Sequence, residues 1–256
     1  MRSYFLAALF LFSGSVFALP TLETLFASTN GHACRLTNFK DRGYTPTSYD
    51  KGMVLTFAKS VCQPGRSDLL VATGPLGPSS LDALAHYGIK DTSLASVYGF
   101  LFGFAMRESS GLWCMGLDSM SREAKTGTAG PETTEGGLFQ TSYNSRNASK
   151  ELPKLFAKYK GSKAGCFSAE FQKGITCKAS DMKNWGTGEG RLFQELSKSC
   201  PAFATEYAAV MLRVKKEHYG PLVRREVQYL PACVDMFKGV EAYIKANPSV
   251  CNSLRE

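Results

Sequence analysis

A glutamate at the end of the most hydrophobic stretch of the sequence has the surroundings of an acid catalyst. Residues 94–106 contain one clearly polar residue, Ser96, and lead directly into Arg107-Glu108-Ser109-Ser110-Gly111. A carboxylate in the last turn of an apolar helix faces the negative end of the helix dipole. This field and the apolar neighbours both favour the protonated form of the carboxyl group. We therefore predict that Glu108 is a general acid.

A second polar cluster follows at residues 132–144. Two glutamates, Glu132 and Glu135, precede the pair Gly136-Gly137 in this cluster. Cleavage of a glycosidic bond commonly uses one protonated carboxyl group for the leaving oxygen and a second carboxylate that activates water or stabilises the cation. We predict Glu135 as this second carboxylate, because it directly adjoins the glycine pair, with Glu132 as the other candidate. The predicted substrate-binding residues, whose side chains can hydrogen-bond a sugar, are Glu132, Gln140, Tyr143 and Asn144.

Together these two motifs resemble a known enzyme superfamily. An apolar helix that closes with Glu108-Ser109, followed downstream by Gly137-Leu138-Phe139-Gln140, is similar to the goose-type lysozymes and soluble lytic transglycosylases. The resemblance covers residues 94–145, and Phe139 stands where that superfamily usually has Met. It implies a lysozyme-like fold, Glu108 as the catalytic acid, Gln140 in the cleft and the β-1,4 glycan of peptidoglycan as the substrate.

The elements that must position these residues are predicted to be mainly α-helical. Residues 94–106 form a central buried helix that Ser93 caps, and Gly99 and Gly103 on one face of it let a neighbouring backbone approach closely. Residues 111–144 form a long loop or a small irregular hairpin. Apolar spacing predicts the remaining helices at 80–87, 148–159, 203–214 (with its end placed at Gly220-Pro221) and 234–244.

Three segments are expected along the chain. Residues 1–18 have the pattern of a secretory signal peptide, with Arg2 before an apolar run and a cleavage site after Ala18. Residues 19–80 are predicted to be an irregular, cysteine-containing arm packed on the core, because they are rich in Pro and Gly and show no helical period. Residues 81–256 form the lysozyme-like helical domain. The mature chain is thus expected in the periplasm or outside the cell, without membrane insertion.

The cysteines agree with export. The chain has 8 Cys, an even number, so up to four disulfides are expected in an oxidising compartment. Sequence does not determine which cysteines pair. Proximity along the chain favours Cys34–Cys62, Cys166–Cys177 and Cys233–Cys251.

Charge limits the classes of partner. The net charge of +8 is spread along the chain without a basic run, which argues against nucleic acid and favours an anionic polymer such as the cell wall. Residues 104–144, in contrast, hold more acidic than basic residues. An acidic cleft favours sugars with free ammonium groups, so we expect a preference for partly de-N-acetylated glycan. The expected partner is the glycan strand of peptidoglycan, bound by a monomer with no cofactor and no metal.

Several alternative functions remain open. A lytic transglycosylase would use Glu108 alone, a non-catalytic wall-binding protein would keep the fold without the reaction, and a chitosanase-like enzyme would act on soluble amino-sugar polymers. A thiol protease is disfavoured. Cys114, Asn184 and His218 supply its residue types, but Asn184 precedes His218 in the chain, whereas that family has the order Cys, His, Asn.

Overall fold

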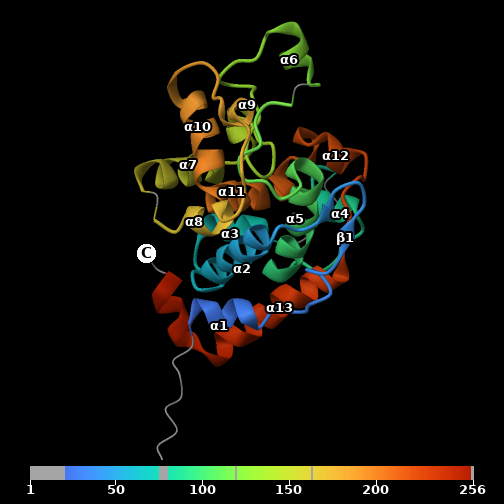
Figure 1. Ribbon diagram of the computed structural model, residues 1–256, viewed down its shortest axis with the longest axis vertical. Helices are drawn as coiled ribbons and strands as arrows, with labels where there is room; N and C mark the ends of the chain where they lie inside the picture. The colour runs from blue at the N-terminus through green and yellow to red at the C-terminus, as the bar shows by residue number, and fades with distance from the viewer. Residues whose placement is uncertain (1–20, 75–79, 119, 163, 255–256) are drawn as a thin grey trace, which may run out of the picture.

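The computed structural model describes residues 21–74, 80–118, 120–162 and 164–254. The predicted signal peptide, 1–18, lies outside these residues. The described part is mainly helical, with one short antiparallel hairpin (Figure 1). Its elements are α1 (Leu22–Ala27), β1 (Asn38–Phe39), β2 (Gly43–Tyr44), α2 (Thr47–Val61), α3 (Ser67–Ala72), α4 (Ala83–His86), α5 (Leu94–Ser109), α6 (Arg122–Thr126), η1 (Tyr143–Ala148), α7 (Glu151–Gly161), α8 (Ser168–Gln172), α9 (Ala179–Met182), α10 (Gly188–Ser199), α11 (Pro201–Val214), η2 (Lys216–His218), α12 (Gly220–Val223), α13 (Pro231–Ala246) and η3 (Pro248–Leu254).

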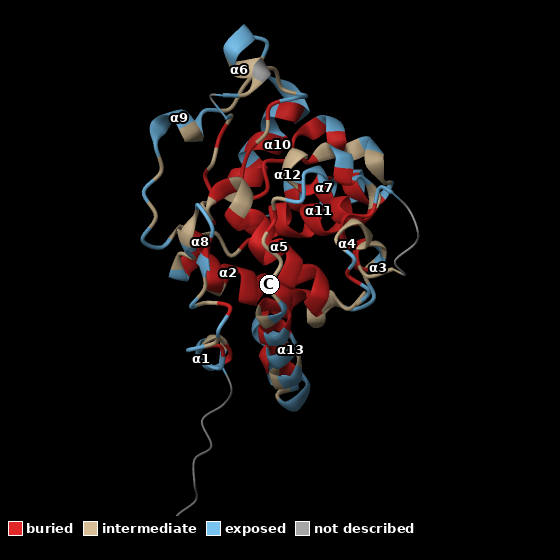
Figure 2. Ribbon diagram, turned by 90° about the vertical axis from the view of Figure 1, so that its right-hand side faces the viewer, coloured by how far each residue is buried: buried red, intermediate tan, exposed pale blue. Residues whose placement is uncertain are grey.

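Helix α5 is the buried central element, as its sequence predicts. The hydroxyl of Ser93 accepts a hydrogen bond from the backbone N–H of Ser96 and caps the helix. A methyl group at Gly99 would lie 2.6 Å from Val234, and one at Gly103 would lie 2.2 Å from the carbonyl oxygen of Gln228. The two glycines therefore do allow α13 and the segment before it to pack closely on α5. Figure 2 shows α5 buried along its length, whereas α13 buries only one side.

The prediction of an irregular arm at residues 19–80 is wrong. The segment contains α1, α3 and the 15-residue helix α2, which packs on α5, α8, α11 and α13. Helix α2 is buried on nearly every side, so it lacks the alternation of polar and apolar faces that reveals a helix in a sequence. Its polar Asp50 and Lys59 are buried too, and each has a partner elsewhere in the fold: Arg35 pairs with Asp50 at 3.2 Å, and Lys59 donates to the hydroxyl of Tyr159 at 2.7 Å.

The other predicted helices are present with shifted ends. They correspond to α4, α7, α11 and α13. Helix α11 ends at Val214, before the predicted stop at Gly220-Pro221. Those two residues instead begin the short helix α12, since proline is favoured in the first turn of a helix.

The four disulfides join segments that are distant in sequence, and all three pairings favoured by proximity are wrong. The bonds are Cys34–Cys233, Cys62–Cys251, Cys114–Cys177 and Cys166–Cys200. The first two tie the N-terminal segment to α13 and η3. Because α2 belongs to the core, its neighbours in space are the last helices of the chain and not the cysteines nearest in sequence.

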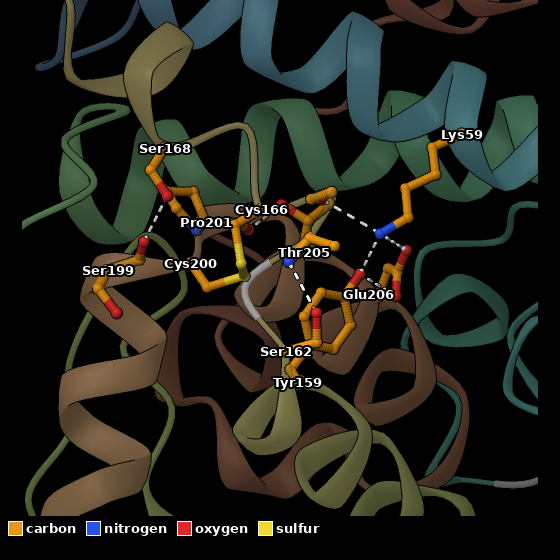
Figure 3. The surroundings of a disulfide bond; sticks show 12 residues. Lys59, Tyr159, Ser162, Cys166, Ser168, Ser199, Cys200, Pro201, Thr205 and Glu206 are labelled. Carbon is orange, nitrogen blue, oxygen red and sulfur yellow. Dashed lines mark hydrogen bonds and ion pairs between the residues drawn. A yellow bond between two sulfur atoms is a disulfide. The ribbon is translucent and has the colours of Figure 1, made fainter. Parts of the chain in front are cut away.

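A charged cluster is buried between α2, α7 and α11, next to the Cys166–Cys200 disulfide (Figure 3). Glu206 of α11 accepts two hydrogen bonds from the guanidinium of Arg66, at 2.6 and 2.9 Å, and one from the hydroxyl of Tyr159 at 2.8 Å. Lys59 donates to the same tyrosine oxygen at 2.7 Å. Glu206 is thus fully buried, and both of its carboxylate oxygens have donors.

Candidate active site

A cleft of about 850 Å³ lies over the C-terminal end of α5. Its walls come from five parts of the chain: the β1–β2 hairpin at Arg42, the end of α5 with the loop that follows it, the loop around Glu135, the segment 176–181 that includes the start of α9, and the start of α12 with Arg224 just after it. These walls are more exposed than the buried body of α5 beneath them (Figure 2). The volume suits a ligand of several sugar-sized groups.

Glu108 lies in the last turn of α5 and lines this cleft. Ser110 and Gly111 follow it with left-handed backbone (φ 54° and 73°), which ends the helix and turns the chain into the cleft wall. Among the described residues, the carboxyl group of Glu108 has no hydrogen bond and no ion pair. Burial raises the pKa of Glu108 to about 8, and the nearby carboxylate of Glu135 adds to the rise.

Glu135 lines the same cleft from the loop of residues 134–141. Burial raises the pKa of Glu135 to about 7, and the negative charges of Glu123 and Asp118 add to this. Like Glu108, it has no hydrogen bond or ion pair within the described part of the chain. The structure therefore brings together the two glutamates that the sequence analysis predicted as catalytic residues, and each favours its neutral form.

Aromatic packing places the Glu135 loop on α5. Gly136 and Thr141 pair across the base of the loop, and Phe139 is fully buried against Phe104 of α5, with ring centroids 5.6 Å apart. The hydroxyl of Thr141 bonds that of Tyr219 at 2.7 Å, and Tyr219 packs edge-on against Phe104. The loop is thus anchored where Glu135 faces Glu108.

Gln140 also lines the cleft, but its side-chain nitrogen is used within the loop. It donates to the carbonyl oxygen of Gly137 at 3.0 Å and to that of Met115 at 3.4 Å. The backbone N–H of Gly137 donates to the same Met115 oxygen at 2.7 Å. Gln140 therefore holds the Glu135 loop against the segment that follows α5.

The other predicted substrate-binding residues do not line this cleft. Glu132 is exposed and forms an ion pair with Arg146 at 2.8 Å. Tyr143 donates to Glu189 at 2.6 Å and lines a separate cavity, and Asn144 is exposed and accepts a hydrogen bond from Ser142. Sequence proximity grouped them with Glu135, but the chain turns away into η1 after Thr141.

The wall of the cleft formed by residues 176–181 was not predicted from the sequence. The Cys114–Cys177 disulfide ties this wall to the segment after α5. Lys198 of α10 fixes it from behind, because its buried ammonium donates to the carbonyl oxygens of Asp181 at 2.6 Å and Lys183 at 2.8 Å. These interactions join segments that are distant in sequence, so no local motif predicts them.

Arginines on one side of the cleft were also missed. Arg42, Arg107 and Arg224 line the cleft, and their positive charges partly oppose the rise in the pKa of Glu108. Arg107 and Arg224 both pair with Glu226, whereas Arg42 has no carboxylate partner among the described residues. Arg42 comes from the β1–β2 hairpin, within the segment predicted to be an irregular arm.

Two other kinds of site find no support in the residues described. No group of three His, Cys, Asp or Glu side chains is placed to hold a metal ion. All eight cysteines are in disulfides, so no free thiol is present for a thiol protease.

Within the residues that the structure describes, no helix has both the length and the apolar character needed to cross a membrane.

Comparison with known proteins adds no name to this site: no family model, no curated protein and no solved structure matches the chain. The function must therefore be argued from the cleft itself.

Proposed function

We propose that this protein is an exported glycoside hydrolase of the lysozyme type, which cleaves the β-1,4 glycan of peptidoglycan. The observation that carries the proposal is the pair Glu108 and Glu135. Both line one cleft, neither forms an ion pair among the described residues, and burial raises the pKa of each. The resemblance of residues 94–145 to goose-type lysozymes and lytic transglycosylases points to the same chemistry. Four disulfides agree with export to an oxidising compartment.

Because their pKa values differ, the two carboxyl groups take different roles in the reaction. Between about pH 7, the pKa of Glu135, and about pH 8, that of Glu108, Glu135 is mostly ionised while Glu108 keeps its proton. Glu108 then protonates the glycosidic oxygen as the bond breaks. Glu135 takes a proton from the attacking water or stabilises the oxocarbenium-like transition state.

A preference for partly de-N-acetylated glycan belongs to this proposal. Asp118 and Glu135 line the cleft, and Glu123 is close enough to raise the pKa of Glu135. A free ammonium group on a sugar would meet these carboxylates, whereas an N-acetyl group carries no charge. Faster release from chemically deacetylated walls than from matched acetylated walls is expected. Faster release from the acetylated walls would contradict this preference.

The first experiment treats purified peptidoglycan with the wild type and with Glu108→Gln and Glu135→Gln. Loss of turbidity, new reducing ends and product masses are measured. We expect Glu108→Gln to lower the rate by about 10²–10⁴-fold, the usual range for removal of a general acid, and Glu135→Gln to lower it substantially too. Glu195→Gln is the matched control, because Glu195 is exposed on α10 and does not line the cleft.

The products separate the competing functions. Reducing ends lost in both variants support a hydrolase with two carboxylates. Anhydro-sugar products that survive Glu135→Gln would instead identify a lytic transglycosylase that uses Glu108 alone. Binding of the wall without cleavage by the wild type would identify a wall-binding protein, and cleavage confined to soluble amino-sugar polymers would identify a chitosanase-like enzyme.

A further inference from the structure

A second cavity, of about 540 Å³, adjoins the cleft, and the side chains that line it carry a net positive charge. Arg42 and Arg107 line both, so the two spaces meet beside Glu108. The second cavity is built from the β1–β2 hairpin, from one face of α5 and from the segment 225–228 that follows α12 (Figure 1). It therefore extends the cleft along α5, and Asp118, which lines the cleft, does not line this cavity.

The lining of this cavity carries more positive than negative charge. Its cations are Lys40, Arg42, Arg107 and Arg225, and its anions are Asp41 and Glu226. Glu226 is already engaged, because Arg107 and Arg224 bind it at 2.6 and 2.5 Å. Hydrogen bonds from these two arginines lower the pKa of Glu226 to about 2, so it stays ionised and paired.

Three of the cations have no carboxylate partner among the described residues. Lys40 and Arg42 make no ion pair there, and the guanidinium of Arg225 donates only to the carbonyl oxygen of His86, at 2.9 Å. The Nε atom of Arg42 is buried and has no hydrogen-bond acceptor. Cations that line a cavity without a carboxylate partner favour a ligand that supplies an anionic oxygen.

The cavity is rigid enough to act as a preformed site. The side chain of Gln228 accepts a hydrogen bond from the backbone N–H of Lys40 at 3.0 Å and ties the hairpin to the opposite wall. The carbonyl of the same residue lies against Gly103 of α5, where a methyl group would come within 2.2 Å. The backbone of the walls that carry the cations is therefore held in place before a ligand arrives, which lowers the entropic cost of binding.

We propose that this cavity is a subsite for a carboxylate carried by the glycan strand whose sugar lies at Glu108. The inference rests on the proposed function. Peptidoglycan bears such carboxylates at regular positions: on the peptide that is joined by an amide bond to the lactyl ether of every second sugar, and on the lactyl group itself wherever that peptide is absent. A strand seated at Glu108 can reach the adjoining cavity with a side group, and the unpaired guanidinium and ammonium groups there bind carboxylates well.

The test measures binding of soluble glycan strands to the protein with Glu108→Gln, which prevents cleavage. Three forms of the strands are compared at near-physiological ionic strength: intact, stripped of peptides by an amidase so that only lactyl carboxylates remain, and fully converted to methylamides so that no carboxylate remains. We expect the intact strands to bind about tenfold more tightly than the methylamide form, the scale of losing a charge-assisted hydrogen bond. The stripped form separates the two sources. Binding as tight as that of the intact form shows that a lactyl carboxylate suffices, and binding as weak as that of the methylamide form assigns the carboxylate to the peptide.

Lys40→Gln/Arg225→Gln, added to Glu108→Gln, tests the cavity itself. These two cations are chosen because they are not among the charges that act on the pKa of Glu108. We expect the preference for carboxylate-bearing strands to fall to within about twofold, because the lost hydrogen bonds are the source of the discrimination. Lys154→Gln/Lys245→Gln is the matched control, since it removes the same charge from exposed lysines on α7 and α13 and should keep the preference.

Equal binding of all three forms, or a preference that survives Lys40→Gln/Arg225→Gln, overturns the subsite. Cleavage by the protein with Glu108 intact is measured separately. Cleavage without any carboxylate preference would leave the hydrolase standing and remove the subsite. Carboxylate-dependent binding without cleavage would support the subsite and contradict the hydrolase. If neither carboxylate-dependent binding nor cleavage is observed, the subsite and the hydrolase are both contradicted.

Discussion

Glu206 and Glu108 are two glutamates on buried helices, and their surroundings shift the pKa in opposite directions. Burial alone would raise the pKa of Glu206, but the hydrogen bonds and charge of Arg66, with further help from Lys59 and Tyr159, hold it below its usual value. Glu108 has no such partner and faces the carboxylate of Glu135, so its pKa rises to about 8. Burial by itself therefore does not mark a functional carboxylate.

The difference lies in how each charge is compensated. The Glu206 cluster is complete within the protein, which suits a structural role in joining α2, α7 and α11. Among the described residues no donor binds the carboxyl groups of Glu108 and Glu135, which costs stability but leaves a proton available for transfer. Stability given up at one site to obtain reactivity is typical of catalytic groups.

Breaking the Glu206 cluster should have the largest effect on folding. Glu206→Gln removes the buried anion and leaves the Arg66 guanidinium less fully paired, so we expect a loss of about 3–5 kcal/mol in the free energy of unfolding. Denaturant unfolding measures this. Glycan cleavage per folded molecule should be unchanged, since Glu206 does not line the cleft. A loss below about 1 kcal/mol would mean that the pair is not worth more than an exposed one.

Glu108→Gln should have the opposite effect on stability, and only at higher pH. The folded protein holds a proton on Glu108 up to about pH 8, whereas the unfolded chain releases it near the ordinary pKa of a glutamate, 4.5. The unfolded state thus binds fewer protons in this window, and Glu108 lowers stability as pH rises through it. We expect the stabilisation by Glu108→Gln relative to wild type to be about 3–4 kcal/mol larger at pH 8 than at pH 5. Equal stability differences at both pH values would contradict the raised pKa.

The pH dependence of cleavage should reflect the same pair. Activity should rise as Glu135 ionises near pH 7 and fall as Glu108 loses its proton near pH 8, giving a narrow maximum between the two. About one pH unit outside this range, the rate should fall roughly tenfold. Initial rates of reducing-end release between pH 4 and pH 10 check this profile. A flat optimum near pH 5 would show that both carboxyl groups titrate as ordinary surface acids.

A half-buried glutamate paired with an exposed lysine supplies the smallest expected effect and the reference for the others. Glu241 pairs with Lys245 one turn away on α13, where the lysine side chain is 71% exposed. Glu241→Gln should change the free energy of unfolding by no more than about 0.5 kcal/mol, because solvent screens such pairs. Denaturant unfolding beside Glu206→Gln gives the comparison. An effect near that of Glu206→Gln would show that the loss comes from charge alone and not from burial.

Sequence patterns predicted the elements in which local signals agree. Helix α5 has a serine cap and an almost continuous apolar run, so its position and its burial are both evident from the chain. The same pattern singled out Glu108, since the helix has to end within a residue or two of it. The Glu135 loop was recognised from its glycines, and packing of Phe139 on Phe104 places it beside α5.

Helix α2 could not be predicted from the sequence, nor could the roles of Arg42 and Lys198 at the cleft, and the physical reason is the same. A helix buried on all sides has no polar face, and buried polar residues such as Lys59 look like surface residues until their partners are known. Arg42 and Lys198 likewise act on the cleft from distant parts of the chain. Such contacts depend on which segments meet in space.

The sequence by itself determined a mainly helical chain, an even set of cysteines and a glutamate at the end of a buried helix. The cysteine count is a matter of composition. The helices and the place of the glutamate follow from short-range rules of helix capping and hydrophobic burial, which act within a few residues. Only the tertiary structure decided the disulfide pairs, the meeting of Glu108 with Glu135, and the contrast with Glu206. A pKa depends on every charge and donor within several ångströms, and the chain brings those groups together only when it folds.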